Sequence, residues 1–241
     1  MVFRLDDNDV RFPNPMIYPP NENGAFCIGG KLTPEWLLLA YSHGIFPWFA
    51  FKWNDEPIWY CPMDRFVIFP REIHVSHSMR TLMNKKEYRV TFNRDFDGVI
   101  EGCSSVDGRY YANGAWLGED IKEAYCKLNR LGYATSVEVW DKKDELVGGL
   151  YGVIMGECYI GESMFSRKPN TSKLALIHLA RFMRKIGGKM IDCQLETPHL
   201  KSMGGRLIPY AEYLEILNPG ALALLSNPES ESNQTSEEES Q

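Results

Sequence analysis

The sequence is poor in the features of membrane proteins and zinc-binding proteins. No run of about 18 apolar residues occurs, so no segment is long enough to cross a bilayer as a helix. The first seven residues turn acidic where a secretory signal would become apolar, which predicts a cytoplasmic protein. The six cysteines are scattered without the two-residue spacing of zinc sites, so we expect reduced, mostly buried thiols.

The chain also lacks net positive charge, since its formal net charge is −6. Residues 226–241 contribute five glutamates and no basic residue, and without them the net charge is −1. This Ser- and Glu-rich segment has no aromatic residue and cannot bury enough apolar surface to offset the entropy lost on ordering. We therefore predict a disordered acidic tail over residues 226–241.

The order of the remaining elements is mixed, which predicts an α+β fold with a mixed sheet flanked by helices. Residues 1–62 are expected to form a small N-terminal domain, in which Thr33 and Pro34 begin a helix that ends at Gly44. Residues 45–62 are rich in Trp and Pro and are expected to form an aromatic-lined loop region. Residues 63–225 are expected to form the larger domain, with strands at 66–69, 88–92, 135–139 and 146–155, and helices at 78–83, 95–103, 118–132, 197–204 and 210–217.

Two further strands and the helix between them carry the most informative residues. One predicted strand, Cys158 to Ile160, ends at a glycine, and the other runs from Met190 to Leu195. The segment between them begins with Thr171 and has an apolar stripe typical of a helix. Short right-handed crossovers pair such strands in parallel, so we expect the two to lie side by side.

This pairing would bring Glu162, Asp192 and Gln194 together. Asp192 and Gln194 are separated by one position, so along a strand their side chains would point to the same face. A structural explanation is available, because a Glu at a strand end can cap a helix and an Asp can accept bonds from backbone donors. Buried carboxylates without partners or purpose are rare, however, and polar groups among apolar residues suit a reaction site.

Six short motifs resemble those of the leucyl/phenylalanyl-tRNA–protein transferases. They are GIFPWF at 44–49, VIEGC at 99–103, AWL at 115–117, ELVGGLYGV at 145–153, GESMFSR at 161–167 and IDCQ at 191–194. The likeness runs from about residue 12 to about residue 217, and six motifs in one order are far more specific than a lone glycine pattern. It implies a small N-terminal domain on an acyltransferase domain like that of the N-acetyltransferases.

The activity that the resemblance implies is transfer of leucine or phenylalanine from an aminoacyl-tRNA to proteins that begin with Arg or Lys. The transfer would mark these proteins for degradation by the N-end rule. No metal or redox cofactor is required, because the aminoacyl ester is already activated. We expect a monomer, since no long exposed apolar stripe is evident in the sequence.

The resemblance also implies an apolar pocket for the transferred side chain. Trp48 follows Phe-Pro in a predicted loop, where a large ring suits stacking on the terminal adenine. Leu150, Tyr159 and Leu179 depart from the family's common Met, Phe and Phe, which predicts a change in pocket shape. Carried over position by position, the pocket residues are Trp48, Trp116, Leu150, Tyr159, Met164, Leu176, Leu179 and Ile191.

Three residues are expected to carry the chemistry. Asp192 would polarise Gln194, whose carbonyl oxygen would accept a hydrogen bond from the attacking amine. Glu162 would bind a cation of the acceptor, either its first side chain or its ammonium group. A Cys193 nucleophile is disfavoured, because its side chain would face away from Asp192 and no histidine motif would activate it.

Two basic clusters are candidates for phosphate contacts with tRNA. Either cluster alone is typical of a solvated face, whereas together with the resemblance they predict one cationic face for the acceptor stem. The first cluster is Arg80, Lys85, Lys86 and Arg89, and the second is Arg167, Lys168 and Lys173.

Two other functions remain open at this point. A coenzyme-A-dependent acyltransferase of the same fold would need a glycine-rich loop opening a helix to bind pyrophosphate, and residues 167–171 are not rich in glycine. A non-catalytic RNA-binding module would explain the cations and tryptophans but not the grouping of Glu162, Asp192 and Gln194.

Overall fold

The computed structural model describes residues 2–48, 56–105 and 119–220. Within these ranges the chain forms a four-stranded sheet and a seven-stranded sheet with seven helices, so the predicted mixed α+β class is confirmed. Trp116 and the predicted tail over 226–241 lie outside the described residues. No helix in the described ranges is long and apolar enough to cross a membrane.

The small sheet is built from residues before position 61, in the order β1-β2-β4-β3. Its strands are β1 (Phe3–Arg4), β2 (Ala25–Ile28), β3 (Phe46–Pro47) and β4 (Ile58–Tyr60), and α1 (Pro34–Ser42) lies between β2 and β3 in the chain. The prediction of a loop region over 45–62 was therefore wrong for β3 and β4. These strands are two and three residues long, too short for an alternating pattern to appear.

The large sheet has the order β11-β5-β10-β9-β8-β7-β6, and all neighbours are antiparallel except β10 and β9. In that one parallel pair Met190 lies opposite Cys158 and Asp192 opposite Ile160, which confirms the predicted pairing. The strands are β5 (Asp64–Ile68), β6 (Arg89–Phe92), β7 (Ala134–Trp140), β8 (Leu146–Met155), β9 (Cys158–Ser166), β10 (Met190–Asp192) and β11 (Arg206–Pro209).

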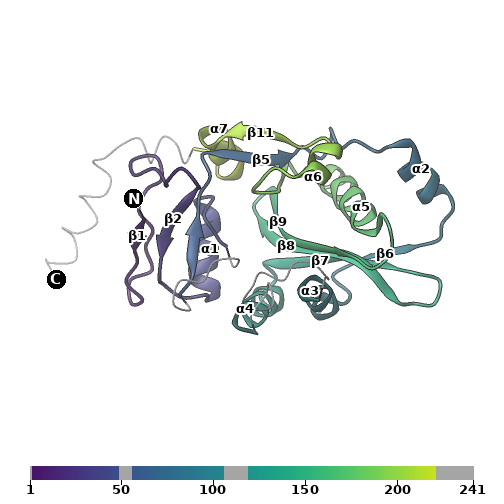
Figure 1. Ribbon diagram of the computed structural model, residues 1–241, viewed down its shortest axis with the longest axis horizontal. Coiled ribbons are helices and arrows are strands. Elements are labelled where there is room, and N and C mark those ends of the chain that lie inside the picture. The colour runs from purple at the N-terminus through teal and green to yellow at the C-terminus, as the bar shows by residue number, and fades with distance from the viewer. Residues whose placement is uncertain (1, 49–55, 106–118, 221–241) are drawn as a thin grey trace, which may run out of the picture.

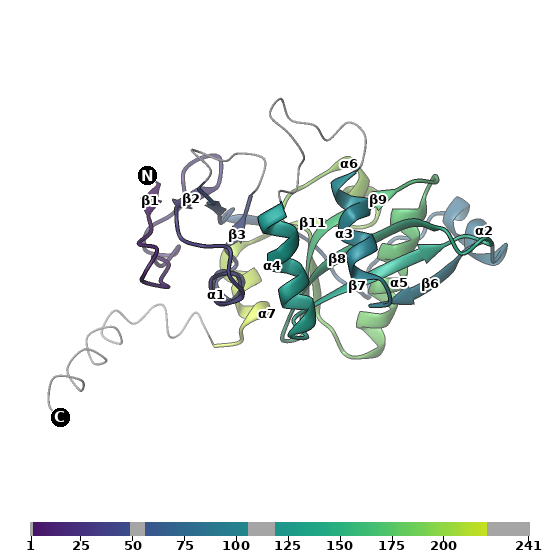
Figure 2. The same cartoon turned by 90° about the horizontal axis from the view of Figure 1, so that it is seen from below.

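Helices cover both faces of the large sheet, as Figures 1 and 2 show. On one face lie α3 (Phe96–Ser104) and α4 (Glu119–Arg130), and on the other lies α5 (Thr171–Lys185) with α2 (His77–Asn84) beside it. Two short helices, α6 (Pro198–Ser202) and α7 (Tyr210–Leu217), flank β11 in the chain.

Each face of the large sheet has its own apolar core. The core under α5 includes side chains of β7, β8, β9 and β10, and we call it the α5 core. The core under α3 and α4 continues without interruption into the small sheet, because Tyr125 and Tyr151 belong to the same cluster as Trp36, Tyr41 and Trp59. The small sheet and one face of the large sheet therefore share a core.

The structure corrects two predicted strand ends around the candidate site. Strand β9 does not end at Gly161 but continues to Ser166, whereas β10 ends at Asp192 instead of Leu195. Helix α5 begins at Thr171, and Asn170 precedes it in a left-handed conformation without a side-chain capping bond. The hydroxyl of Thr171 donates to the carbonyl oxygens of Val147 and Lys168. Strand β11 was not predicted, because its residues follow a Gly-Gly break and lie at the sheet edge.

Candidate functional site

Glu162 is the extra residue of a β-bulge between β8 and β9. Tyr151 pairs with Ser163 and Gly152 pairs with Gly161, so Glu162 has no partner residue on β8. A bulge turns the side chain of its extra residue out of the regular alternation, and bulges are frequent next to active sites. The carboxylate of Glu162 consequently points toward α1 and α4.

Two tyrosines from distant parts of the chain bind the carboxylate of Glu162. Tyr41 on α1 donates to Oε1 and Tyr125 on α4 donates to Oε2, each at 2.7 Å, and the two hydroxyls also contact each other. Burial raises the pKa of Glu162 from its ordinary value of 4.5 to about 7, although the two tyrosine hydrogen bonds act in the opposite direction. The group therefore changes its charge near neutral pH.

Asp192 is fully buried and forms an ion pair with Arg65, which is fully buried as well. Nε of Arg65 donates to Oδ1 at 2.8 Å and Nη2 donates to Oδ2 at 2.7 Å. Tyr213 on α7 adds a hydrogen bond to Oδ2, and the backbone N–H of Gln194 adds one to Oδ1. Arg65 lies beside Asp192 although 127 positions separate the two residues in the sequence, so no local sequence pattern predicts this ion pair.

Gln194 lies beyond the end of β10 in the left-handed region, with φ of 59°. The prediction that its side chain shares a strand face with Asp192 was therefore wrong, because the strand has already ended. Its Nε2 donates to the carbonyl oxygen of Gly161 at 2.7 Å. Gln194 and Glu162 are thus brought together through Gly161, the residue that precedes Glu162 in the bulge.

The predicted apolar residues gather on the other face of the sheet. Tyr159 and Ile191 lie on neighbouring strands, and the hydroxyl of Tyr159 donates to the carbonyl oxygen of Thr135. Met164 is partly buried at the margin of this group. The fully packed members, all in the α5 core, are Leu150, Tyr159, Leu176, Leu179 and Ile191.

Trp48 follows β3 and packs its ring against Phe46 and Tyr60, with ring centroids 6.1 and 5.1 Å away. Its backbone N–H donates to Ile58, so the residue continues the pairing with β4 instead of lying in a free loop. Its indole Nε1 is buried and has no hydrogen-bond partner among the described residues. A buried donor of this kind is costly to leave unmatched.

The seven predicted basic residues fall into paired and unpaired groups. Arg89 forms an ion pair with Asp144 at 2.6 Å, and Lys168 forms one with Asp141 at 2.5 Å, which lowers the pKa of Asp141 to about 2. The turn between β7 and β8 thus connects the two basic clusters and neutralises one cation of each. The members without an ion pair to a described residue are Arg80, Lys85, Lys86, Arg167 and Lys173.

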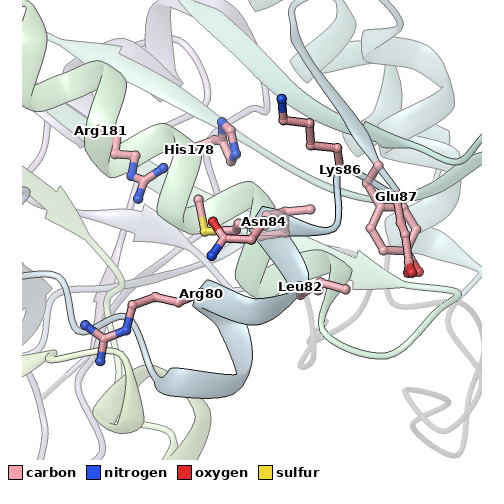
Figure 3. Close-up of a pocket in the computed structure, with 10 residues that line it drawn as sticks. Arg80, Leu82, Asn84, Lys86, Glu87, His178 and Arg181 are labelled. Carbon is pink, nitrogen blue, oxygen red and sulfur yellow. The ribbon is translucent and has the colours of Figure 1, made fainter.

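A cavity of about 540 Å³ opens between α2 and α5. Figure 3 shows Arg80 on α2, Lys86 after it, and His178 and Arg181 on α5 around this space. His178 and Arg181 were not among the predicted residues, although positions 174, 178 and 181 have the spacing of one helical face. Burial and the nearby Arg181 lower the pKa of His178, so its ring is neutral at physiological pH. The remaining lining residues are Leu82, Met83, Asn84, Glu87, Tyr88 and Leu174.

All six cysteines are free thiols, four of them buried and two partly buried. Burial raises the pKa of the Cys193 thiol, the one nearest Asp192 in sequence, so it is not an activated nucleophile. Within the described ranges no three side chains of His, Cys, Asp or Glu are grouped as metal ligands.

Comparison with known proteins gives one family for both parts of the chain. The family model described as leucyl/phenylalanyl-tRNA protein transferase matches residues 67–218, and the model of that family's N-terminal domain matches residues 30–63. The transferase of that name from Pseudomonas fluorescens is 47% identical over 218 residues, covering 89% of this chain and 94% of its own. The one from Syntrophus aciditrophicus is 46% identical over 207 residues, covering 84% of each chain.

Likeness to solved structures is much weaker. The structure described as L-PGS from Bacillus licheniformis aligns with a TM-score of 0.39 and 14% sequence identity, covering 74% of this chain and 56% of that one. This alignment is too weak to assign a fold family.

Proposed function

The chain belongs to the leucyl/phenylalanyl-tRNA protein transferase family, and on this premise we propose that it transfers leucine or phenylalanine from an aminoacyl-tRNA to the amino terminus of an acceptor protein. Acceptors begin with Arg or Lys, and the added residue marks them for degradation by the N-end rule. The observation that supports the proposal most strongly is the family match over residues 67–218, within which Gln194 donates to Gly161, the residue before Glu162.

The reaction converts an ester into a peptide bond. The acceptor's α-amino nitrogen attacks the ester carbonyl carbon, the bond from that carbon to the ribose oxygen breaks, and the amine proton ends on the released ribose hydroxyl. The ester is already activated, so the enzyme mainly aligns the two reactants, a contribution worth roughly 7 to 11 kcal/mol at best. No metal or redox cofactor takes part in this balance.

Gln194 is proposed to orient the attacking amine. Its Nε2 is engaged with the carbonyl of Gly161, which turns Oε1 into the group free to accept a hydrogen bond from the amine. The amide does not titrate, so its acceptor is available at every working pH. Asp192 fixes the backbone of Gln194 through Oδ1, and its action on the side chain is therefore indirect.

Glu162 is proposed to bind the cationic end of the acceptor. Each of its oxygens accepts one tyrosine hydroxyl, which leaves a second acceptor position on each oxygen. A cation at this position would favour the ionised carboxylate and lower its pKa from about 7. Charge-assisted pairing of this kind selects Arg or Lys over an acidic first residue.

The apolar pocket is proposed to form at the margin of the α5 core. Met164 and Gln194 are both partly buried, whereas Leu150, Tyr159, Leu176, Leu179 and Ile191 fill the interior behind them. Trp48 packs against the other core and is proposed to offer its unmatched Nε1 to the terminal nucleotide, whereas Trp116 lies outside the described residues. Leu179 is smaller than the Phe common in the family, Tyr159 adds a hydroxyl to the common Phe, and Leu150 has nearly the volume of the common Met, so we propose that the pocket differs in shape mainly at positions 159 and 179.

The α2–α5 cavity is proposed as the main phosphate site for the tRNA. Arg80, Lys86 and Arg181 surround it without ion-pair partners among the described residues, so their charge is available to a phosphate. Lys85, Arg167 and Lys173 extend the same cationic face. Arg89 and Lys168 contribute less, because Asp144 and Asp141 already neutralise them.

Two structural units are proposed, with their boundary near residue 63. The small sheet uses residues 3–60 and the large sheet residues 64–209, and the two family models divide between residues 63 and 67. The mixed sheet flanked by helices supports an acyltransferase domain like that of the N-acetyltransferases over 63–225. Because the units share a core, we expect them to unfold together.

The decisive assay follows labelled leucine from leucyl-tRNA onto a peptide that begins with Arg. We expect transfer to Arg and Lys peptides and none to the matched peptide that begins with Asp. Absence of transfer of both leucine and phenylalanine by folded protein that binds the charged tRNAs would overturn the proposal.

A further inference from the structure

Arg65 lies under the candidate site without touching either proposed reactant. Resting on the function proposed above, we propose that Arg65 is a positioning residue for transfer, which locks Asp192 as a fully occupied acceptor so that Asp192 fixes Gln194 and takes no proton from the amine. None of the six sequence motifs contains Arg65.

The surroundings of Arg65 immobilise its guanidinium group. The side chain is 0% exposed and lies 4.7 Å from the ring centroid of Phe46 and 4.6 Å from that of Tyr213. Besides its two bonds to Asp192, it donates from Nη1 to the carbonyl oxygen of Gly44 at 2.8 Å. Burial alone would lower the pKa of Arg65, but the charge of Asp192, its hydrogen bonds and the nearby Tyr213 together raise the pKa above its ordinary value, so the arginine stays charged.

Asp192 has no acceptor position left for a substrate amine. An ionised carboxylate offers about four lone-pair positions, two on each oxygen. Oδ1 accepts from Nε of Arg65 and from the backbone of Gln194, whereas Oδ2 accepts from Nη2 of Arg65 and from the hydroxyl of Tyr213. A carboxylate so occupied, and fully buried, orients its neighbours instead of accepting a proton.

The conformation of Gln194 depends on this arrangement. A non-glycine residue with positive φ is strained, and its conformation persists when the surrounding structure over-determines it. The backbone N–H of Gln194 donates to Asp192, its carbonyl oxygen accepts from Phe66, and its Nε2 donates to Gly161. Since Phe66 follows Arg65 on β5, the same strand supplies both the cation and the backbone donor.

Arg65 also connects this turn to the N-terminal unit. Gly44, which accepts its third hydrogen bond, has φ of 67°, and a Cβ built there would lie 2.6 Å from the ring of Tyr213. Only glycine therefore allows the carbonyl at this position to face the guanidinium. Phe46, two residues later, covers one face of the same group.

The test is a double-mutant cycle on transfer rate. Arg65→Lys keeps the charge but cannot form the bidentate contact, so we expect kcat to fall about 10- to 100-fold, with KM for aminoacyl-tRNA within about threefold of wild type. In a Gln194→Ala background the same substitution should cause almost no further loss, because it acts through Gln194. Arg206→Lys, in an exposed pair with Glu72 over the Phe69 ring, is the matched control and should leave kcat unchanged.

A merely structural role for Arg65 would give additive losses in the cycle, and that result would overturn the proposal. An unchanged kcat, or a loss confined to KM, would overturn it too. If Arg65→Lys does not fold, Tyr213→Phe removes a single hydrogen bond to Asp192 and should show the same non-additivity with a loss of about threefold to tenfold. If wild-type protein fails to transfer while binding charged tRNA, the function proposed above fails; an active wild type with an additive cycle contradicts only the role of Arg65.

Discussion

The hydroxyl of Tyr125 donates a 2.7 Å hydrogen bond to Oε2 of Glu162, and this joins a helix on one face of the large sheet to the bulge in β9. Tyr41 from the N-terminal unit donates to the other oxygen. The carboxylate is therefore oriented before any substrate arrives, while its pKa of about 7 leaves its charge sensitive to what binds nearby. Substitution of Glu162 therefore tests most directly whether this carboxylate binds substrate or only supports the fold.

Glu162→Gln should weaken binding of the acceptor. Loss of a charge-assisted hydrogen bond raises KM for an Arg-starting peptide by about 10- to 100-fold, with less effect on KM for the tRNA. Because the pKa of Glu162 is about 7, the wild-type KM for the peptide should fall between pH 6 and pH 8 as the carboxylate ionises. Steady-state kinetics from pH 6 to pH 8 would measure the KM of the variant and the pH dependence of the wild-type KM. An unchanged preference for Arg and Lys in the Gln variant would refute the assigned role.

The same substitution should stabilise the protein at alkaline pH. The pKa of Glu162 is raised on folding, so between about pH 4.5 and 7 the folded state binds more protons than the unfolded state. The free energy of unfolding therefore decreases through this window, by up to ~3 kcal/mol, and Glu162→Gln removes that decrease. Denaturant unfolding at pH 5 and pH 8 should show that the free energy of unfolding of the variant, relative to wild type, increases with pH. Glu101→Gln should show no such trend, because the hydrogen bond from Lys122 lowers the pKa of Glu101 and keeps it ionised at both pH values.

Replacements of Gln194 should separate activity from backbone strain. Gln194→Ala and Gln194→Gly both remove the side-chain acceptor, and each should lower kcat by about 10- to 100-fold at unchanged tRNA affinity. The glycine variant should be more stable than the alanine variant by about 1 kcal/mol, because φ of 59° is unstrained for glycine. Single-turnover kinetics measure the transfer rate, and thermal melts measure the stability of each variant. Near-normal transfer by either variant would exclude Gln194 from the reaction.

Removal of cations around the α2–α5 cavity should act on tRNA affinity alone. Arg80→Ala and Arg181→Ala should each weaken binding and reduce the slope of log K against log salt by about 1. Arg89→Ala should do less, because Asp144 already pairs with this arginine. Filter binding of charged tRNA at several salt concentrations measures the loss of affinity for each variant. Arg4→Ala, which removes an arginine paired with Glu56, is the control. Equal effects of Arg89 and Arg181 would remove the cavity from the proposed tRNA site.

Trp48→Phe should weaken substrate binding without destabilising the free protein. Phenylalanine retains an aromatic ring against Phe46 and Tyr60 but removes an Nε1 that has no partner among the described residues. Leaving a buried donor unmatched costs about 1 to 3 kcal/mol, so its loss offsets the lost packing in the free protein. Melting temperature and KM for aminoacyl-tRNA, measured together, would check this. A variant that melts much earlier with unchanged KM would make Trp48 an ordinary core residue.

The sequence allowed the helices and the central pairing to be predicted, because their patterns are local. Ile121, Ala124, Tyr125 and Leu128 form one apolar stripe, and α4 has its predicted limits to within two residues. The strand–helix–strand unit predicted the parallel pairing of β9 and β10. Both inferences depend on residues close together in the chain.

The partners of the site residues could not be predicted in the same way. Tyr41 is 121 positions from Glu162, and Arg65 is 127 positions from Asp192, so neither contact leaves a periodic trace. The bulge adds one residue, Glu162, to β9, and Gln194 lies in a left-handed turn after β10 has ended, so strict alternation cannot anticipate the direction of either side chain. The short strands β3 and β4 depend on pairing with each other, and that is a tertiary property.

The partners of Asp192 also determine when the site is complete. Arg65 and Tyr213, which donate to Asp192, come from the second and last parts of the described chain, and Gly44, which accepts from Arg65, comes from the first. Contacts between such distant positions form late in folding, because a long loop must close before they are made. Because Tyr213 lies on α7, its hydrogen bond to Asp192 forms only after α7 has been synthesised, so the acceptor positions of Asp192 are all filled only when the chain is made up to this helix.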